Sequence, residues 1–211
     1  MEASAASAPS APHLEPEPPE WQPRALWFSA RLLCGVATFF FASFLFAYFY
    51  LRSLNNNHAW RYGAVHPSAG LGLSIAALLV LSAIVFRLGA SRPTDTFGAG
   101  IAALLMALVA IALQCVEYTT LGFGPASGGY ASVFIGWTAF YTLFALGCVY
   151  WMETQLASLW RARREQITRP VREGVPASDD DLIRAGIEAC SFFWAFYVAI
   201  GVVAAIVLYV V

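Results

Sequence analysis

Five long apolar stretches dominate this 211-residue chain, and each is close to the length that crosses a bilayer. They cover approximately residues 32–51, 69–86, 97–116, 130–152 and 189–211. A helix needs about 20 apolar residues to span about 30 Å of hydrocarbon. Charged residues make up only 12% of the chain, against about 25% in a soluble domain. The sequence therefore predicts an all-α integral membrane protein, a bundle of five transmembrane helices.

The beginning of the chain differs in composition from the rest. Residues 1–26 are rich in Ala, Pro, Ser and Glu, and such a segment cannot bury enough apolar surface to offset its chain entropy. We expect a disordered tail there and a membrane domain over residues 27–211. The helices of that domain are predicted at about 27–51, 69–86, 97–116, 130–152 and 182–211, with a loop over 153–181.

The arginines predict the orientation. With five crossings, ten of the twelve arginines fall on the side of the amino terminus, and only Arg52 and Arg61 fall on the other. Loops rich in Lys and Arg stay in the cytoplasm. We therefore expect a cytoplasmic amino terminus, with the tail and the loop 153–181 on that side, and an outward carboxyl terminus. The formal net charge of −1 gives no reason to expect a nucleic-acid partner.

None of the apolar stretches contains a histidine. The three histidines are His13, His58 and His66, all outside them. Haem or copper in a membrane is usually held by imidazole, so this argues against a redox centre inside the chain. We expect no catalytic residue, no metal ligand and no cofactor of its own, and predict that the chain supports chemistry carried out by other proteins.

A few polar residues interrupt the apolar stretches. Gln114, Glu117 and Tyr118 are spaced i, i+3, i+4, so they share one face at the outer end of the third helix. Polar groups inside membrane spans are functional candidates. Two interpretations remain open at this point. Either Glu117 only marks the interface where the helix ends, or the three residues form a patch that binds a lipid headgroup or a partner helix.

Four segments resemble, in order and spacing, a known family. They are Phe46-Ala47-Tyr48-Phe49-Tyr50-Leu51-Arg52 followed by Trp60; Leu113-Gln114-Cys115-Val116-Glu117-Tyr118; Tyr130-Ala131-Ser132 leading to residues 138–144; and Gly186-Ile187-Glu188-Ala189 leading to Trp194-Ala195-Phe196. Together they resemble subunit III of the haem-copper terminal oxidases. The resemblance covers about residues 27–211, and five helices match the shorter form of that family.

The resemblance implies a non-catalytic subunit of a respiratory terminal oxidase in a bacterial plasma membrane. The complex, a cytochrome c or quinol oxidase, would reduce oxygen to water and move protons. Haem and copper would belong to the catalytic subunit I, with subunit II and a small subunit IV as further partners. This chain would pack on the catalytic subunit, bind phospholipid and sustain proton entry. Candidate contacts with lipid or other subunits are Gln114, Glu117 and Tyr118 on the outer side, Glu188 and Trp194 on the inner side, and Arg52.

Five positions depart from the family pattern. Tyr141 and Phe144 stand where the fourth of these helices carries histidines, and Ala195 and Val198 stand where the last carries His and Asp. The acid typical of the first of these helices is absent, and its place falls near Ala37. The chain thus lacks the residues to which the family's buried polar network and proton-linked role are ascribed.

Other functions fit parts of the same pattern. The corresponding subunit of a nitric-oxide reductase or of a quinol oxidase would look almost the same from this chain. A small membrane transporter is a second class, but internal repeats, broken helices and charges near the midplane are not evident. An assembly or anchoring protein with no lasting place in an oxidase is a third.

Overall fold

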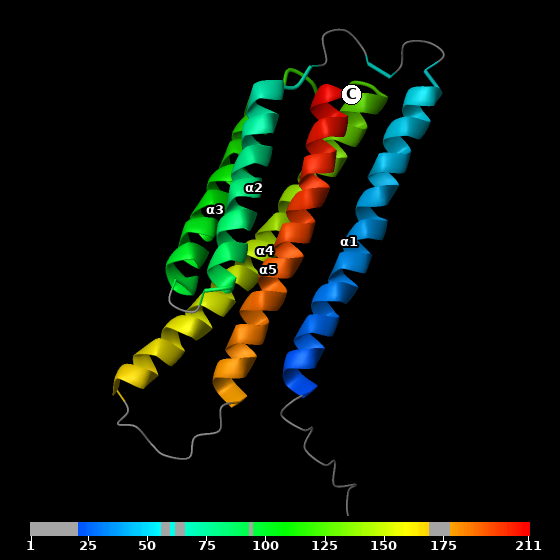
Figure 1. The fold of residues 1–211 in the computed structure, drawn as a ribbon. Helices are drawn as coiled ribbons and strands as arrows, with labels where there is room; N and C mark the ends of the chain where they lie inside the picture. Colours follow the sequence, from blue (N-terminus) through cyan, green and yellow to red (C-terminus); the bar gives the residue numbers. More distant parts are fainter. Residues whose placement is uncertain (1–20, 56–59, 62–65, 93–94, 169–177) are drawn as a thin grey trace, which may run out of the picture.

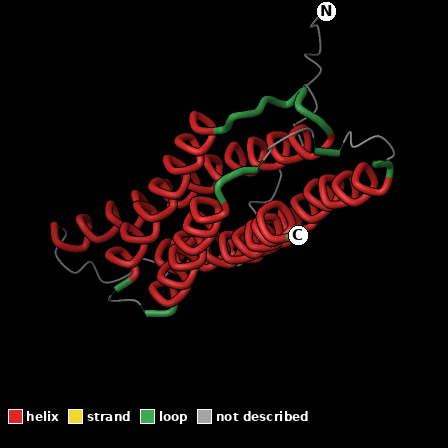
Figure 2. The backbone as a smooth tube through the Cα atoms, turned by 90° about the horizontal axis from the view of Figure 1, so that it is seen from above, coloured by secondary structure: helices red, strands yellow, loops and turns green. Residues whose placement is uncertain are grey.

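The computed structural model describes residues 21–55, 60–61, 66–92, 95–168 and 178–211, and within them the chain is helical without strands (Figures 1 and 2). The elements are α1 (Trp21–Ser53), α2 (Ala69–Ala90), α3 (Thr96–Thr120), α4 (Gly129–Thr168), α5 (Ser178–Ala205) and a short π-helix, η1 (Ile206–Val210). Five helices are long and apolar enough to cross a membrane. The predicted all-α fold with five such helices is therefore confirmed.

Helix α5 occupies the centre of the bundle (Figure 1). It packs against α1, α2 and α4, while α3 packs against α2 and α4. The apolar part of α5 is half buried inside the chain, whereas α1 is mostly exposed on the outside of the bundle. Residues on α5 are thus best placed to connect the other helices.

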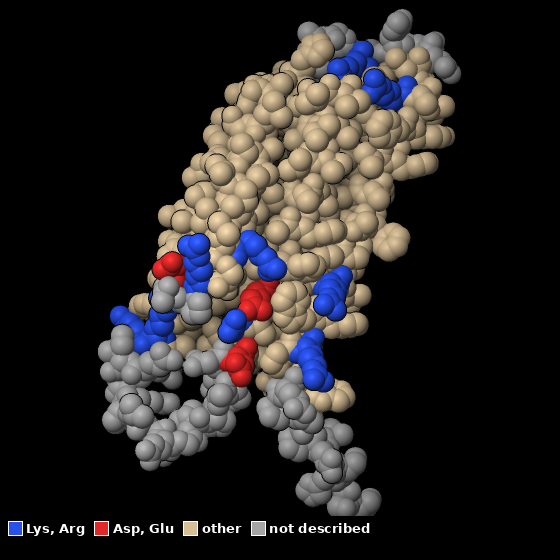
Figure 3. Space-filling model, viewed as in Figure 1, with Lys and Arg blue, Asp and Glu red and all other residues tan. Residues whose placement is uncertain are grey.

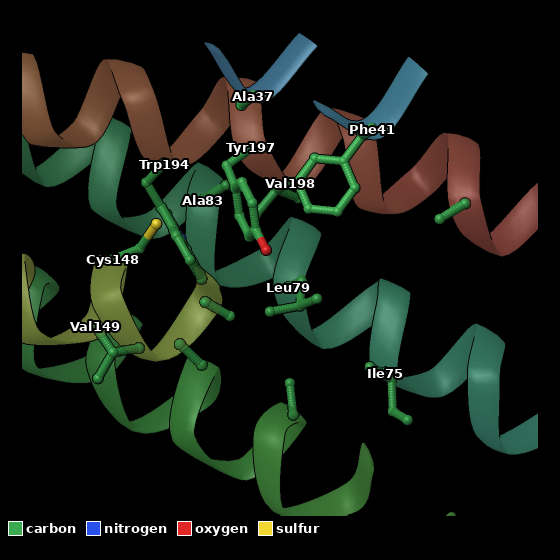
Figure 4. Close-up of a cluster of buried hydrophobic side chains, with 14 of the residues drawn as sticks. Ala37, Phe41, Ile75, Leu79, Ala83, Cys148, Val149, Trp194, Tyr197 and Val198 are labelled. Atoms are coloured by element: carbon green, nitrogen blue, oxygen red, sulfur yellow. The ribbon is translucent and has the colours of Figure 1, made fainter. Parts of the chain in front are cut away.

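The core at the middle of the bundle combines small and aromatic side chains. Figure 4 shows residues of α1, α2, α4 and α5 meeting around Trp194 and Tyr197, including Phe41, Leu79 and Cys148. In a membrane, lipid tails would be as apolar as these side chains, and the helices would then be held together by close packing and by interhelical hydrogen bonds.

Helix α1 begins earlier than the sequence predicts. It starts at Trp21, so residues 21–26, expected in the tail, are helical. Pro23 lies in the first turn, where a helix tolerates proline because that backbone N–H has no partner within the helix. The remaining part of the predicted tail, residues 1–20, lies outside the described residues.

Helix α4 corrects the first part of the predicted loop over 153–181, of which residues 169–177 lie outside the described residues. It continues through residues 153–168, and α5 begins at Ser178 rather than at 182. The extension contains no Gly or Pro, the two residues least favourable in a helix, so the helix continues beyond the last apolar residues. Leu156 in this extension packs onto Gly100 of α3, where any larger residue would collide with it.

Charged side chains gather at the two ends of the bundle and are absent from the middle of the face in Figure 3. Arg52 lies in the last turn of α1. Its Nη1 donates to the Val211 carbonyl oxygen at 3.3 Å, so this end of α1 lies at the same end of the bundle as η1. Arg87 lies in the last turn of α2, at the opposite end of the bundle. An uncharged belt between two charged ends is the arrangement that a lipid-embedded bundle requires.

Candidate functional site

Glu117 is fully buried in the last turn of α3. Its Oε2 accepts hydrogen bonds from Gln114 Nε2 and from the Tyr209 hydroxyl, each at 2.7 Å. Its Oε1 is also buried and has no hydrogen-bond partner among the described residues. The side chain of Glu117 is therefore enclosed by the bundle at the end of α3. It is the acceptor at the centre of an internal polar cluster.

Tyr209 reaches Glu117 from the π-helix η1. A π-helical turn holds more residues than an α-helical turn, so it changes which side chains face the bundle. The Tyr209 ring lies over Gly72 of α2, whose missing Cβ leaves the space that the ring fills. It also meets the Phe134 ring of α4 at 5.5 Å. Tyr209 thus joins η1 to α2, α3 and α4.

Three aromatic rings extend this cluster toward α1. The ring centroids of Tyr48 and Trp60 are 5.0 Å apart, and that of Tyr130 lies 5.8 Å from Trp60 and 6.4 Å from Tyr48, all edge to face. The Tyr130 hydroxyl donates to the Leu208 carbonyl, and its backbone N–H donates to the Trp60 carbonyl at 2.9 Å. The Arg61 guanidinium covers the Tyr130 ring at 4.0 Å. The cluster therefore binds together the start of α4, the end of α1 and η1.

The other two outer candidates lie near the cluster without bonding to Glu117. Arg52 donates to the Tyr48 hydroxyl at 3.5 Å and to the Val211 carbonyl. The Tyr118 hydroxyl is buried and lies beside the Thr138 and Thr142 side chains of α4. Of the predicted outer patch, the structure brings Gln114 and Glu117 together. Their contact with a lipid headgroup or a partner stays a prediction.

The inner candidates belong to a second polar connection. Trp194 is buried, and its Nε1 donates to Ser82 Oγ of α2 at 3.1 Å. Ser82 Oγ in turn donates to the Ala103 carbonyl of α3 at 2.8 Å. Trp194 thus links three helices. Glu188 is partly exposed and pairs with Arg184 at 3.0 Å on the same helix, which contributes little to stability.

A tyrosine pair forms a further link that the sequence did not indicate. The rings of Tyr141 in α4 and Tyr197 in α5 stack at 4.5 Å with an angle of 10°. The Tyr141 hydroxyl donates to the Tyr197 carbonyl at 3.2 Å, and the Tyr197 hydroxyl donates to the Tyr141 carbonyl. Tyr141 stands at one of the five positions that depart from the family pattern. Where that pattern carries a histidine, this chain therefore has a tyrosine whose hydrogen bonds link α4 to α5.

The other four positions that depart from the family pattern line two apolar grooves. Ala37 and Phe144 lie in a groove of about 400 Å³ between α1, α4 and α5. Ala195 and Val198 lie in a second groove, of about 480 Å³, between α2 and α5. Where the family pattern carries polar side chains, this chain has apolar ones, of which Ala37 and Val198 are buried and Phe144 and Ala195 are partly exposed.

No group of three or more His, Cys, Asp or Glu side chains able to hold a metal ion occurs among the residues that the structure describes. No family model matches the chain. No curated protein matches it. The assignment of a function therefore depends on the motifs of the sequence and on the contacts that they make in the fold.

Proposed function

We propose that this chain is subunit III of a respiratory haem-copper terminal oxidase, a non-catalytic subunit embedded in a bacterial plasma membrane. The complex reduces oxygen to water and moves protons, with haem and copper in the catalytic subunit I. Subunit II and a small subunit IV complete it. The chain packs on the catalytic subunit, holds phospholipid and sustains proton entry from the cytoplasm.

The observation that supports this proposal most is the meeting of three motif segments in one cluster. Tyr48, Glu117 and Tyr130 come from the first three of the four separate segments that carry the resemblance. Tyr48 and Tyr130 touch directly. Tyr130 connects to Glu117 through the rings of Phe134 and Tyr209, at 6.0 Å and 5.5 Å, and the Tyr209 hydroxyl. Residues singled out by order and spacing alone thus interact in the fold.

The proposed orientation follows from the charges. The amino-terminal end of the bundle carries most of the arginines in Figure 3. Arg52 and Arg61 lie at the other end, where they contact Val211 and Tyr130. Cytoplasmic loops carry the excess of Lys and Arg, which favours a cytoplasmic amino terminus and an outward carboxyl terminus.

The exposed face of α1 is available for packing on the catalytic subunit. This helix exposes large aromatic side chains, among them Phe28, Phe39 and Phe46 at 68%, 83% and 69%. A contiguous apolar face of this kind suits either lipid or a neighbouring helix. The groove beside Ala37 carries no carboxylate or imidazole, so the proposed effect on proton entry acts through packing and not through a proton-carrying group of this groove.

Purification of the intact complex tests the proposal. The full-length chain, tagged at its amino terminus, is isolated from native membranes in mild detergent, and its co-purifying proteins are identified by mass spectrometry. We expect a stoichiometric haem-bearing catalytic subunit. Co-purification of nitric-oxide reductase subunits instead would assign the chain to that enzyme. Recovery of the chain without any haem protein would overturn the proposal.

A further inference from the structure

We propose that Cys148 of α4 and Cys190 of α5 form a redox-active dithiol, which a lipid-soluble quinone oxidises to a disulfide. Both cysteines are buried free thiols. The inference goes beyond the proposed function. It concerns two helices of this chain alone, so it does not depend on which enzyme complex contains the chain.

The stacked tyrosine pair fixes how α4 and α5 face each other. The two helices run in opposite directions (Figure 1), and Tyr141 and Tyr197 lie at the same level, because each hydroxyl bonds to the other residue's carbonyl. Cys148 follows Tyr141 by seven residues, and Cys190 precedes Tyr197 by seven. Seven residues are about two turns, or about 10 Å, along each helix. The two thiols therefore lie opposite each other, on the faces that carry the tyrosines.

Further contacts agree with this placement. The Cys148 sulfur points from α4 toward α5, beside Trp194 (Figure 4), and it lies near enough to Cys190 to interact with it electrostatically. Beyond the cysteines, the Gln155 side chain reaches Gly186 of α5, so the two helices touch on both sides of the pair.

The geometry of packed helices allows a bond between the two sulfurs. The axes of packed helices are about 8 to 10 Å apart, and each Cα lies about 2.3 Å from its axis. Facing Cα atoms therefore come within the span of about 7 Å that a disulfide can bridge.

Only one of the two thiols borders a groove that an oxidant could enter. Cys148 lines the groove of about 400 Å³ between α1, α4 and α5, and Cys190 is not among its lining residues. Gly147 leaves space beside Cys148, and the rings of Trp151 and Phe193 form part of the same lining. Cys148 is thus the thiol that an oxidant in the groove meets first, and Cys190 completes the disulfide.

The lining of the groove selects the class of oxidant. None of its side chains is charged, so an ionic oxidant would lose its hydration there without compensation. A quinone is uncharged, and its flat ring suits a slot lined by aromatic side chains.

The reaction transfers two hydrogen atoms. Two S–H bonds break and one S–S bond forms, and both hydrogens pass with their electrons to the two quinone oxygens, which gives the hydroquinone. Thiols, disulfide, quinone and hydroquinone are all uncharged, so the reaction leaves no charge inside the apolar interface. Its product joins α4 to α5 covalently.

Oxidation of the full-length chain in nanodiscs tests the proposal. The reduced chain is incubated without oxygen with decylubiquinone, and hydroquinone formation is followed by absorbance. The remaining thiols are then blocked with N-ethylmaleimide in denaturant, and disulfide-linked peptides are mapped by mass spectrometry. We expect one hydroquinone per chain and a disulfide between Cys148 and Cys190.

Serine variants identify the reacting thiols. Cys148→Ser and Cys190→Ser should each abolish both hydroquinone formation and the disulfide. Cys34→Ser and Cys115→Ser, on α1 and α3, are the controls and should react as wild type. In Cys190→Ser the apolar reagent N-phenylmaleimide should still label Cys148, whereas in Cys148→Ser it should leave Cys190 unlabelled. Thermal unfolding of each variant verifies that it is folded.

A second pair of variants tests entry through the groove. Gly147→Leu fills the groove at a position with nothing within 4 Å of a new Cβ, and it should slow the reaction several-fold. Ala199→Leu fills the groove between α2 and α5 at an exposed position and should leave the rate unchanged.

Three results would overturn the proposal. The first is the absence of a disulfide between Cys148 and Cys190 after incubation with the quinone. The second is hydroquinone formation in Cys190→Ser at the rate of the wild type. The third is an equal rate in Gly147→Leu and Ala199→Leu, which would exclude entry through the groove. None of these readouts measures haem, so they fail independently of the oxidase assignment.

Discussion

The hydroxyl group of Tyr209 donates a 2.7 Å hydrogen bond to the carboxylate of Glu117, 92 residues earlier in the chain. This bond joins the π-helix η1 to the last turn of α3, and Gln114 supports the same oxygen. A buried polar group away from water needs such partners. The pair therefore closes one end of the bundle and holds the final turn of the chain against it.

Removing the acceptor should destabilise this end of the protein. In Glu117→Leu the Tyr209 hydroxyl and the Gln114 amide lose their partner, and we expect the free energy of unfolding to fall by about 1 to 3 kcal/mol. Glu117→Gln keeps a carbonyl oxygen as acceptor and should cost less. Thermal and denaturant unfolding in detergent measure both. Glu153→Gln, an exposed change on α4, is the control and should have no effect.

Two glycines of α2 provide a matched pair. A Cβ at Gly72 would collide with the Tyr209 ring, whereas nothing lies within 4 Å of a Cβ at Gly70. Gly72→Ala should therefore displace Tyr209 and destabilise the chain. Gly70→Ala should leave stability unchanged or raise it by up to about 1 kcal/mol, since alanine favours helix. Equal unfolding curves for the two variants would contradict the placement of Tyr209.

The number and position of the helices could be predicted because each apolar run is long enough to span lipid. The residues at which the helices begin and end could not be predicted in this way. Hydropathy shows where the lipid-facing part stops, while the helix itself continues through residues 153–168, which are helix formers with no Gly or Pro. At the other end of the chain, the composition of residues 1–26 suggested a tail, but residues 21–26 are helical, and Pro23 lies in the first turn, where proline is tolerated.

The candidate site was predictable only where its partners are neighbours on one helix. The i, i+3 spacing placed Gln114 and Glu117 on one face, and they are hydrogen-bonded. Tyr209 could not be predicted, because the π-helix that turns it inward breaks the 3.6-residue period. The partner of Trp194 is Ser82, 112 residues away, and no local pattern reveals such a contact.

The tyrosine pair between α4 and α5 should contribute through its two hydrogen bonds. Tyr141→Phe and Tyr197→Phe each remove one bond and keep the stacked ring. In membrane proteins such bonds contribute about 0.6 kcal/mol on average and up to about 1.7. Each variant should lose stability on that scale in detergent unfolding, and the double variant more. Tyr150→Phe, at an exposed position, should behave as wild type.

The orientation can be tested at two exposed loop positions. Ser91 follows α2 and Ala126 lies between α3 and α4, so they flank opposite ends of α3 and the proposed topology puts them on opposite sides of the membrane. In a chain with Cys115 replaced by Ala, a membrane-impermeant maleimide should label Ala126→Cys in intact cells and Ser91→Cys only after lysis. The opposite pattern would place the amino terminus outside and contradict the proposed orientation.

The absorption spectrum of the native complex tests the central claim most directly. The complex is purified through the full-length chain, and its reduced-minus-oxidised difference spectrum is recorded together with the molar ratio of haem to chain. The proposed function predicts a terminal-oxidase haem spectrum at a constant, stoichiometric ratio to this chain, with the haem on another subunit. A preparation in which the chain is abundant and the haem absent, or in which haem is bound by this chain itself, would contradict the proposal.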